Sequence, residues 1–121
     1  MGHKKNYKYY KHEKGVIGLP RHVFNSEEYI YLSCGAKCLL NVLQSLYTPQ
    51  RNGRLGLSHR KAMEALNISS HSTIQNYFNE LIERRFIELA YEGNFKKGIA
   101  REWRLTYQPY NGKEPTNEWK I

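Results

Sequence analysis

The sequence predicts an α+β fold in which a bundle of helices precedes one small antiparallel β-hairpin. Apolar residues recur at helical spacing between residues 33 and 47 and again between residues 74 and 82. Residues 87–91 and 100–107 instead alternate apolar and other side chains, and a Gly-rich loop joins these two runs. With 121 residues, of which 40% are hydrophobic, the chain has enough apolar material for one modest core.

Composition divides the chain into three segments. Residues 1–15 interleave Lys with Tyr and have no aliphatic side chain after Met1, so we expect a flexible basic arm. Residues 16–107 hold the periodic patterns and form the expected domain. Residues 108–121 lack periodicity but end in large apolar side chains, so they are interpreted as a strap across the domain or as a tail that pairs with a second copy.

Positive charge dominates the composition. There are 19 Lys and Arg against 11 acidic residues, all of them Glu, which gives a formal net charge of +8 and a pI near 9.5. This balance favours a polyanionic partner. The lack of Asp argues against the carboxylate-held magnesium of nucleases and polymerases, and no nucleophile with a base or phosphate-binding Gly loop is evident. We therefore expect no enzyme activity and no cofactor.

Cys34 and Cys38 lie four residues apart, which is a poor spacing for a disulfide within one helix. No His at a motif spacing accompanies them, so buried or half-buried structural thiols are expected rather than a metal site.

The chain has no run of about eighteen apolar residues for a membrane span and no apolar run after its basic start. These features predict a cytoplasmic, nucleoid-associated protein with no membrane partner and no small-molecule ligand.

The first part of the domain is expected to supply the first helix of the bundle. Residues 16–24 are mostly apolar and should pack as an extended lead-in segment, after which Asn25 or Ser26 caps a short helix over residues 27–31. Ser33 then caps a longer helix. Its expected core residues keep the i, i+3, i+4, i+7 rhythm and are Ala36, Leu39, Leu40, Leu43, Leu46 and Tyr47.

A helix-turn-helix is expected next. Residues 54–57 indicate a short strand leading to Ser58, the cap of a helix whose core residues would be Ala62, Ala65 and Leu66. Ser72 and Gln75 are spaced as a capping box, which predicts a second helix over residues 72–85 with hydrogen bonding from near Thr73. The apolar residues of that helix gather into one stripe facing the core: Ile74, Phe78, Leu81 and Ile82.

The opposite face of this second helix is polar in its first two turns. The second helix of a helix-turn-helix enters the DNA major groove, where amides pair with adenine and hydroxyls reach bases or phosphates. The candidate base-reading residues are Ser70, His71, Ser72, Thr73, Gln75, Asn76 and Asn79. A polar face opposite an apolar stripe is also ordinary for any surface helix, so the helix alone leaves both interpretations open.

The hairpin is expected to contribute both core and charge. Its core-facing residues would be Ile87, Leu89, Trp103, Leu105 and Tyr107. Its basic tip, residues 92–101, would form a wing that grips phosphate or probes the minor groove, although a solvated loop is the alternative. The candidate phosphate-binding residues are Arg60, Lys61, Lys96, Lys97 and Arg101, with Lys4, Lys5, Lys8 and Lys11 of the arm.

Five runs carry a family resemblance: NGRLGLS (52–58), LNIS (66–69), ELIERRFI (80–87), REWRLT (101–106) and GKEPT (112–116). Together they resemble winged-helix proteins, and most of all the small helix-turn-helix proteins of bacterial phages and mobile elements. The chain departs from that pattern by what looks like one extra residue between Ile68 and Thr73. The resemblance implies DNA binding, either in transcription regulation or in the DNA-binding part of a replication initiator.

These observations predict a protein that binds double-stranded DNA with sequence preference, as a transcription regulator or a replication-origin binder. The alternative is a winged-helix module for protein–protein interaction, with Tyr7, Tyr9, Tyr10 and the aromatic tail as its surface. Winged-helix proteins often bind palindromes as dimers, so a homodimer is compatible with the sequence. No long coiled coil requires one.

Overall fold

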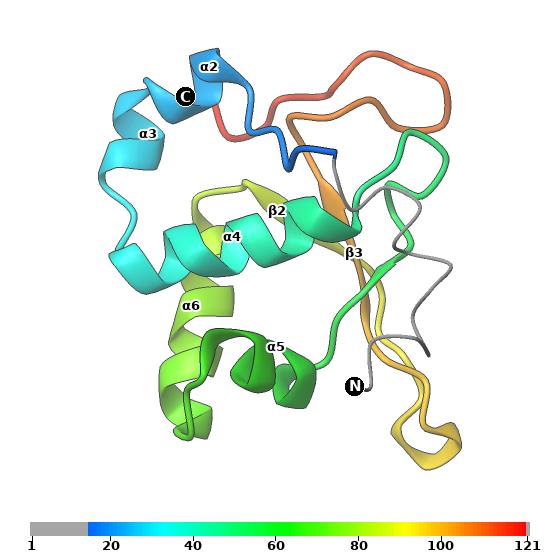
Figure 1. Ribbon diagram of the computed structural model, residues 1–121. Helices are drawn as coiled ribbons and strands as arrows, with labels where there is room; N and C mark the ends of the chain where they lie inside the picture. The colour runs from blue at the N-terminus through cyan, green and yellow to red at the C-terminus, as the bar shows by residue number, and fades with distance from the viewer. Residues whose placement is uncertain (1–14, 121) are drawn as a thin grey trace.

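Residues 15–120 are described by a computed structural model of the chain, which shows a mixed α+β fold with helices packed against a three-stranded antiparallel sheet (Figure 1). In chain order the elements are α2 (Arg21–Phe24), α3 (Glu27–Ile30), α4 (Cys34–Leu46), β1 (Leu55–Gly56), α5 (His59–Leu66), α6 (His71–Glu83), β2 (Ile87–Tyr91), the 3₁₀ helix η2 (Phe95–Lys97) and β3 (Glu102–Leu105). The predicted α+β class, with helices that precede an antiparallel hairpin, is confirmed.

The short helices α2 and α3 lead into the bundle. The expectation of an extended segment up to Phe24 is wrong, because the carbonyl of Pro20 accepts hydrogen bonds from the amides of Val23 and Phe24, both at 3.0 Å. Proline suits this position, since its fixed φ is compatible with the start of a helix. Of the two expected caps for α3, Ser26 takes the role and accepts a hydrogen bond from the Tyr29 amide at 3.1 Å.

Helix α4 begins where the sequence predicts. The hydroxyl of Ser33 caps it by accepting a hydrogen bond from the Ala36 amide at 3.1 Å. The predicted stripe is buried from Ala36 to Leu43, and Leu46 and Tyr47 are half-buried against it. The expected burial of Cys34 and Cys38 is wrong: both thiols are free and exposed, because they lie on the opposite side of the helix from this stripe.

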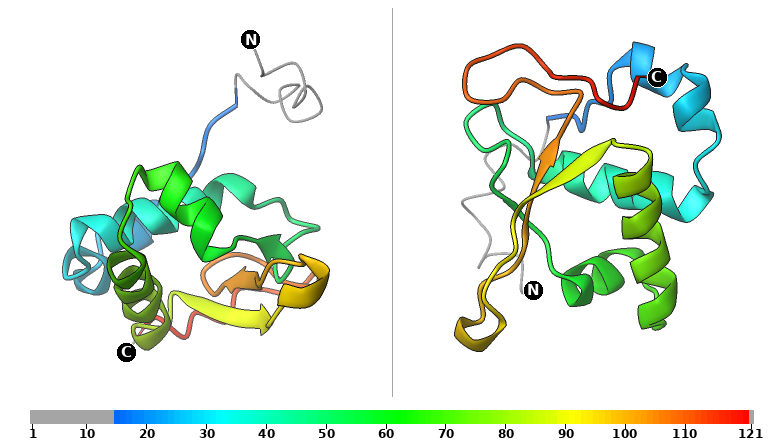
Figure 2. Two further views of the ribbon diagram at one scale, coloured as in Figure 1. Left: turned by 90° about the horizontal axis from the view of Figure 1, so that it is seen from below. Right: turned by 180° about the vertical axis from the view of Figure 1, so that it is seen from behind.

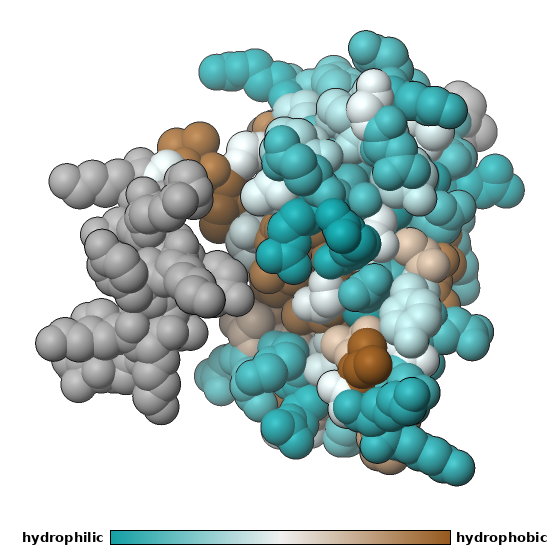
Figure 3. All heavy atoms as spheres, turned by 90° about the vertical axis from the view of Figure 1, so that its right-hand side faces the viewer, coloured by the Kyte–Doolittle hydropathy of each residue, from teal (hydrophilic) through white to brown (hydrophobic). Residues whose placement is uncertain are grey.

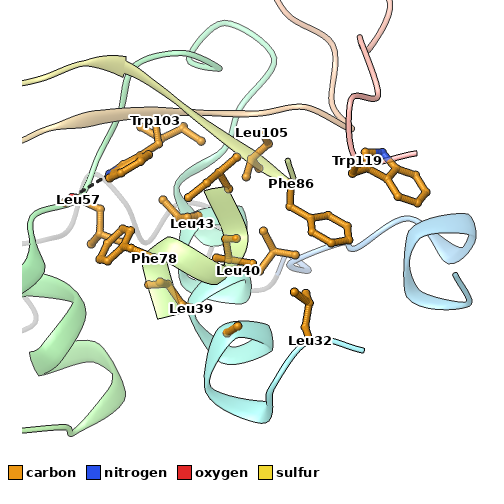
Figure 4. Close-up of a cluster of buried hydrophobic side chains, with 14 of the residues drawn as sticks. Leu32, Leu39, Leu40, Leu43, Leu57, Phe78, Phe86, Trp103, Leu105 and Trp119 are labelled. Atoms are coloured by element: carbon orange, nitrogen blue, oxygen red, sulfur yellow. Dashed lines mark hydrogen bonds between the residues drawn. The ribbon is translucent and has the colours of Figure 1, made fainter. Parts of the chain in front are cut away.

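The core lies between the helices and the sheet (Figure 4). Phe78 of α6 stacks on Trp103 of β3 with ring centroids 5.0 Å apart. The indole Nε1 of Trp103 donates to the carbonyl oxygen of Leu57 at 3.0 Å, so its one polar atom is satisfied inside the core. Three residues expected in the core are exposed instead, namely Ala65, Ile82 and Leu89.

Strand β3 is central in the sheet, whose strand order is β1-β3-β2. Leu55 pairs with Trp103, and Leu89 pairs with the same residue from the other side. The β2 register shifts between Leu89 and Tyr91. Leu89 is the last residue of the edge strand β2 before this irregularity, and its side chain is 37% exposed.

Residues 108–120 pack across the domain as a strap (Figures 1 and 2). Trp119 is only 2% exposed and stacks on Phe86, with ring centroids 5.6 Å apart and an interplanar angle of 13°. Arg104 of β3 is also buried, and its guanidinium binds Glu88 at 2.8 Å and Glu118 of the strap at 3.1 Å. The strap therefore completes the fold at the end of the molecule where α2 lies.

Candidate functional site

Two helices and a tight turn form the centre of the candidate site. Ser58 caps α5 by accepting a hydrogen bond from the Lys61 amide at 3.1 Å. Asn67 ends α5 in the left-handed conformation, with φ 54° and ψ 48°, and the Ile68 amide then donates to the Met63 carbonyl at 2.9 Å. Asparagine adopts this conformation more readily than most residues, so it can reverse the chain between the helices.

The start of α6 differs from the predicted one. Ser70, and not Ser72, is the cap: its hydroxyl accepts a hydrogen bond from the Thr73 amide at 3.2 Å. The expected capping box is wrong because Gln75 does not reach back to the helix start; its amide instead donates to Asn79 Oδ1 at 2.8 Å. Helix α6 spans 71–83 rather than 72–85.

The end of α6 is set by a second chain reversal. Arg84 is the C-cap, and Arg85 follows with a φ of 62° in the left-handed region. The Phe86 amide donates to the Leu81 carbonyl at 3.0 Å, and the Phe86 ring enters the core at the start of β2. This reversal places the hairpin beside α6.

The predicted base-reading residues all lie at or near the N-terminal half of α6. His71, Ser72, Asn76 and Asn79 are exposed, whereas the other three, Ser70, Thr73 and Gln75, are half-buried. Because Gln75 and Asn79 bind each other, Asn76 has the more available amide: no hydrogen bond within residues 15–120 engages its side chain. Of the three amides, that of Asn76 is therefore the most available to an external partner.

The hairpin tip, residues 92–101, projects from the same end of the molecule as the N-terminus of α6 (Figures 1 and 2). Lys96, Lys97 and Arg101 are all exposed. The tip is an ordered loop, since Asn94 and Ile99 exchange two backbone hydrogen bonds of 2.9 Å each. Its lysines are thus carried by a defined backbone.

His59 belongs to this site and was missed in the sequence. It occupies the first position of α5 and stacks on Phe78 with ring centroids 4.8 Å apart. Burial lowers the pKa of its imidazole, and the nearby charges of Arg101 and His71 lower the pKa further. His59 therefore marks the point where α5, α6 and the hairpin meet, although nothing in its local sequence pattern indicates this role.

Arg60 and Lys61 are exposed on α5, yet both lie close to an acid that the sequence interpretation left out. Glu64 is 3.7 Å from Arg60 Nε and 3.8 Å from Lys61 Nζ. Exposed ion pairs contribute only about 0–1 kcal/mol, so a phosphate can compete with Glu64 for either cation. The candidate residues Lys4, Lys5, Lys8 and Lys11 lie outside the described residues.

Glu80 is a further acid of α6, and it is turned away from the exposed N-terminal half of the helix. Its carboxylate accepts hydrogen bonds from the Ser33 amide at 2.5 Å and from the Ser33 hydroxyl at 2.8 Å. A carboxylate at a helix N-terminus is favourable to the helix dipole. Glu80 thereby links α6 to the start of α4.

No protein-family model, curated protein or solved structure matches the chain. Within residues 15–120, no group of three or more His, Cys, Asp or Glu side chains is placed to hold a metal ion. In the same part of the chain no helix combines the length and apolar character needed to cross a membrane.

Proposed function

We propose that this chain is a winged helix-turn-helix protein that binds double-stranded DNA with sequence preference. The observation that carries the proposal is the shared position of two features: the exposed polar start of α6 and the basic hairpin tip project from one end of the molecule (Figure 1). A helix that enters the major groove beside a hairpin that contacts the adjacent backbone or minor groove needs this placement. The output would be transcription regulation or origin binding.

Each part has a distinct role in this proposal. Asn76 reads a base edge, with His71 and Ser72 close to the helix start for bases or phosphates. Lys96 and Lys97 contact phosphates from the hairpin tip. Phosphate contacts raise affinity for every duplex, whereas base contacts separate one sequence from another.

Selection of bound sequences from a random duplex pool tests the proposal directly. We expect a defined motif, and a preferred duplex that binds roughly a thousandfold or more tightly than a scrambled one at physiological salt. Repeats in the motif would also reveal whether two copies bind together. Absence of binding at physiological salt would contradict the proposal.

Two substitutions separate the proposed roles. Asn76→Ala should weaken binding to the preferred duplex by about 1–3 kcal/mol and leave binding to scrambled DNA almost unchanged. Lys96→Ala should weaken binding to both duplexes. It should also reduce the slope of log affinity against log salt concentration by roughly one. Exposed residues far from the site provide matched controls, Asn41→Ala on α4 and Lys113→Ala on the strap. Equal losses on both duplexes for Asn76→Ala would remove it from base reading.

One observation favours the protein-interaction alternative. Phe24, Ile30 and Tyr31 on and beside α2 and α3 are 57–67% exposed, which is unusual for three large apolar side chains close in sequence. A protein partner on this surface should bind tightly at high salt, because apolar contacts are not screened. DNA binding should instead weaken steeply with salt.

A further inference from the structure

Phe95 is the most exposed large apolar side chain in residues 15–120, with a relative exposure of 100%. It lies at the very tip of the hairpin, in the first position of η2. On the face of the molecule that carries the hairpin, hydrophilic side chains predominate and apolar ones form separate small patches (Figure 3). A fully exposed phenyl ring gains nothing from folding, and at the hairpin tip it is accessible to an external partner.

The backbone around Phe95 is built to hold this ring outward. Asn94 caps η2, with its side chain accepting a hydrogen bond from the Lys97 amide at 3.1 Å, and Gly98 closes the turn with a φ of 68°. Gly93, at a φ of 80°, has no room for a side chain: a Cβ there would lie 2.6 Å from the carbonyl oxygen of Ile99. Two glycines and one cap therefore fix the turn that presents Phe95.

The charges beside the ring indicate the chemistry of that partner. Lys96 and Lys97 follow Phe95 directly, and Arg101 lies at the base of the tip, whose one acid, Glu92, lies at the other base. A partner surface that complements the tip has an apolar recess for the ring and negative charges around that recess for the lysines. A DNA duplex has this arrangement in its grooves, where stacked bases lie between two rows of phosphates.

We propose that Phe95 inserts as a wedge between adjacent base pairs, from the minor-groove side, while Lys96 and Lys97 hold the flanking phosphates. Apolar wedges of this kind partly unstack one base step and kink the duplex away from the inserted side chain. The inference rests on the proposed DNA binding and adds a deformation of the DNA to it. Flexible pyrimidine–purine steps such as TA are the preferred insertion points, because they unstack most easily.

The test measures base unstacking and binding separately. The selected duplex carries 2-aminopurine in place of one adenine at a time, since this base becomes several-fold brighter when it unstacks. Wild-type protein should raise the 2-aminopurine fluorescence at one base step. Phe95→Ala should bind about tenfold more weakly, and at saturating protein it should leave the fluorescence at that step unchanged. Phe95→Leu should restore part of the signal, because leucine also serves as a wedge.

Controls keep the outcomes distinct. Tyr31→Ala removes another exposed aromatic ring, 67% exposed on the far part of the molecule, and should keep the full signal. Phe95→Ala should keep the wild-type melting temperature, since its ring buries nothing. If wild-type protein binds but no step brightens, or if Phe95→Ala brightens the same step, the wedge is overturned while the DNA-binding proposal stands.

Two further outcomes would also overturn the wedge. If the wild-type chain binds no duplex, both proposals fall together. If the chain binds phosphatidylserine vesicles in a Phe95-dependent way and unstacks no base, the ring serves a lipid surface instead.

Discussion

His59 combines a useful apolar contact with a cost. Its ring stacks on Phe78, but its Nε2 atom is buried with no hydrogen-bond partner among the described residues. A buried polar atom without a partner is destabilising, and a protonated ring would be worse. The lowered pKa of His59, caused first by burial and then by the charges of Arg101 and His71, expresses the same cost.

The pH dependence of stability follows from this pKa. In the unfolded chain His59 titrates near the ordinary value of about 6.5, so below that pH the unfolded state binds more protons than the folded state. The free energy of unfolding should therefore fall as the pH drops from about 7 to 5, and the His59 contribution should be constant above about 7.5. Denaturant titrations of wild-type and His59→Phe protein across this range measure it. His59→Phe should show a smaller loss, and parallel curves for both proteins would contradict the assignment.

Single residues also show why part of the site escaped prediction. Asn76 and Lys96 could be picked out as candidates from the sequence, because Asn76 lies on the polar face of an amphipathic helix and Lys96 in the basic loop of a predicted hairpin. Phenylalanine is a residue type usually found in the core, so the sequence does not predict an exposed Phe95. Its outward position depends on the turn that includes Gly93 and Gly98. Arg104 alternates with the core residues of β3 and would be expected in solvent, yet the strap covers it.

At the scale of elements, α4 and α6 meet at a contact between a glycine and an aromatic ring. The ring of Tyr77 packs directly over Gly35, and a Cβ at that position would overlap the ring. Glycine is less favourable than alanine within a helix, so its use here reflects close packing rather than helix formation.

The contact predicts a change of sign in a double-mutant cycle. Gly35→Ala should destabilise the protein by about 1–3 kcal/mol, because the Tyr77 ring must leave its position. In a Tyr77→Ala background the overlap is gone, so Gly35→Ala should be neutral or slightly stabilising through helix propensity. Chemical denaturation of the four proteins gives the coupling. Additive effects would show that the two residues do not interact.

Element prediction succeeded where periodicity and a single cap agreed. In α4, Ser33 precedes an unbroken apolar stripe, and the helix starts there. Before α6 two serines, Ser70 and Ser72, are both residues suited to a helix cap, and Ser70 takes the role. The chain reverses at the left-handed Asn67 just before this cap, and local residue spacing carries no information about that reversal.

At the scale of the whole molecule, the strap joins the two ends of the described chain. Trp119 stacks on Phe86, lies 5.8 Å from His22 of α2 between ring centroids, and donates from Nε1 to Asn117 at 3.0 Å. The Asn117 amide in turn donates to the Thr106 carbonyl at 2.8 Å. The large apolar side chains near the end of the sequence favour either a strap or pairing with a second copy, and their aperiodic spacing does not show which residues a strap would contact.

Removal of the Trp119 ring should be costly. Trp119→Ala is expected to lower the free energy of unfolding by about 3–5 kcal/mol, a large share of the roughly 5–15 kcal/mol typical of a domain. Trp119→Phe, the stacking control, keeps an aromatic ring on Phe86 and should therefore lose much less stability than Trp119→Ala. Thermal and urea unfolding measure both. A loss below about 1 kcal/mol for Trp119→Ala would mean that the strap is not part of the cooperative fold.

The anchoring of α6 has a calorimetric consequence. Glu80 ties it to Ser33, the Tyr77 ring locks it over Gly35, and Phe78 stacks on Trp103, so the helix has little freedom to move against the rest of the domain. A surface that is already rigid loses little conformational entropy when it is covered. The heat-capacity change on association should therefore match the apolar area buried at the contact itself, with no added share from folding of α6.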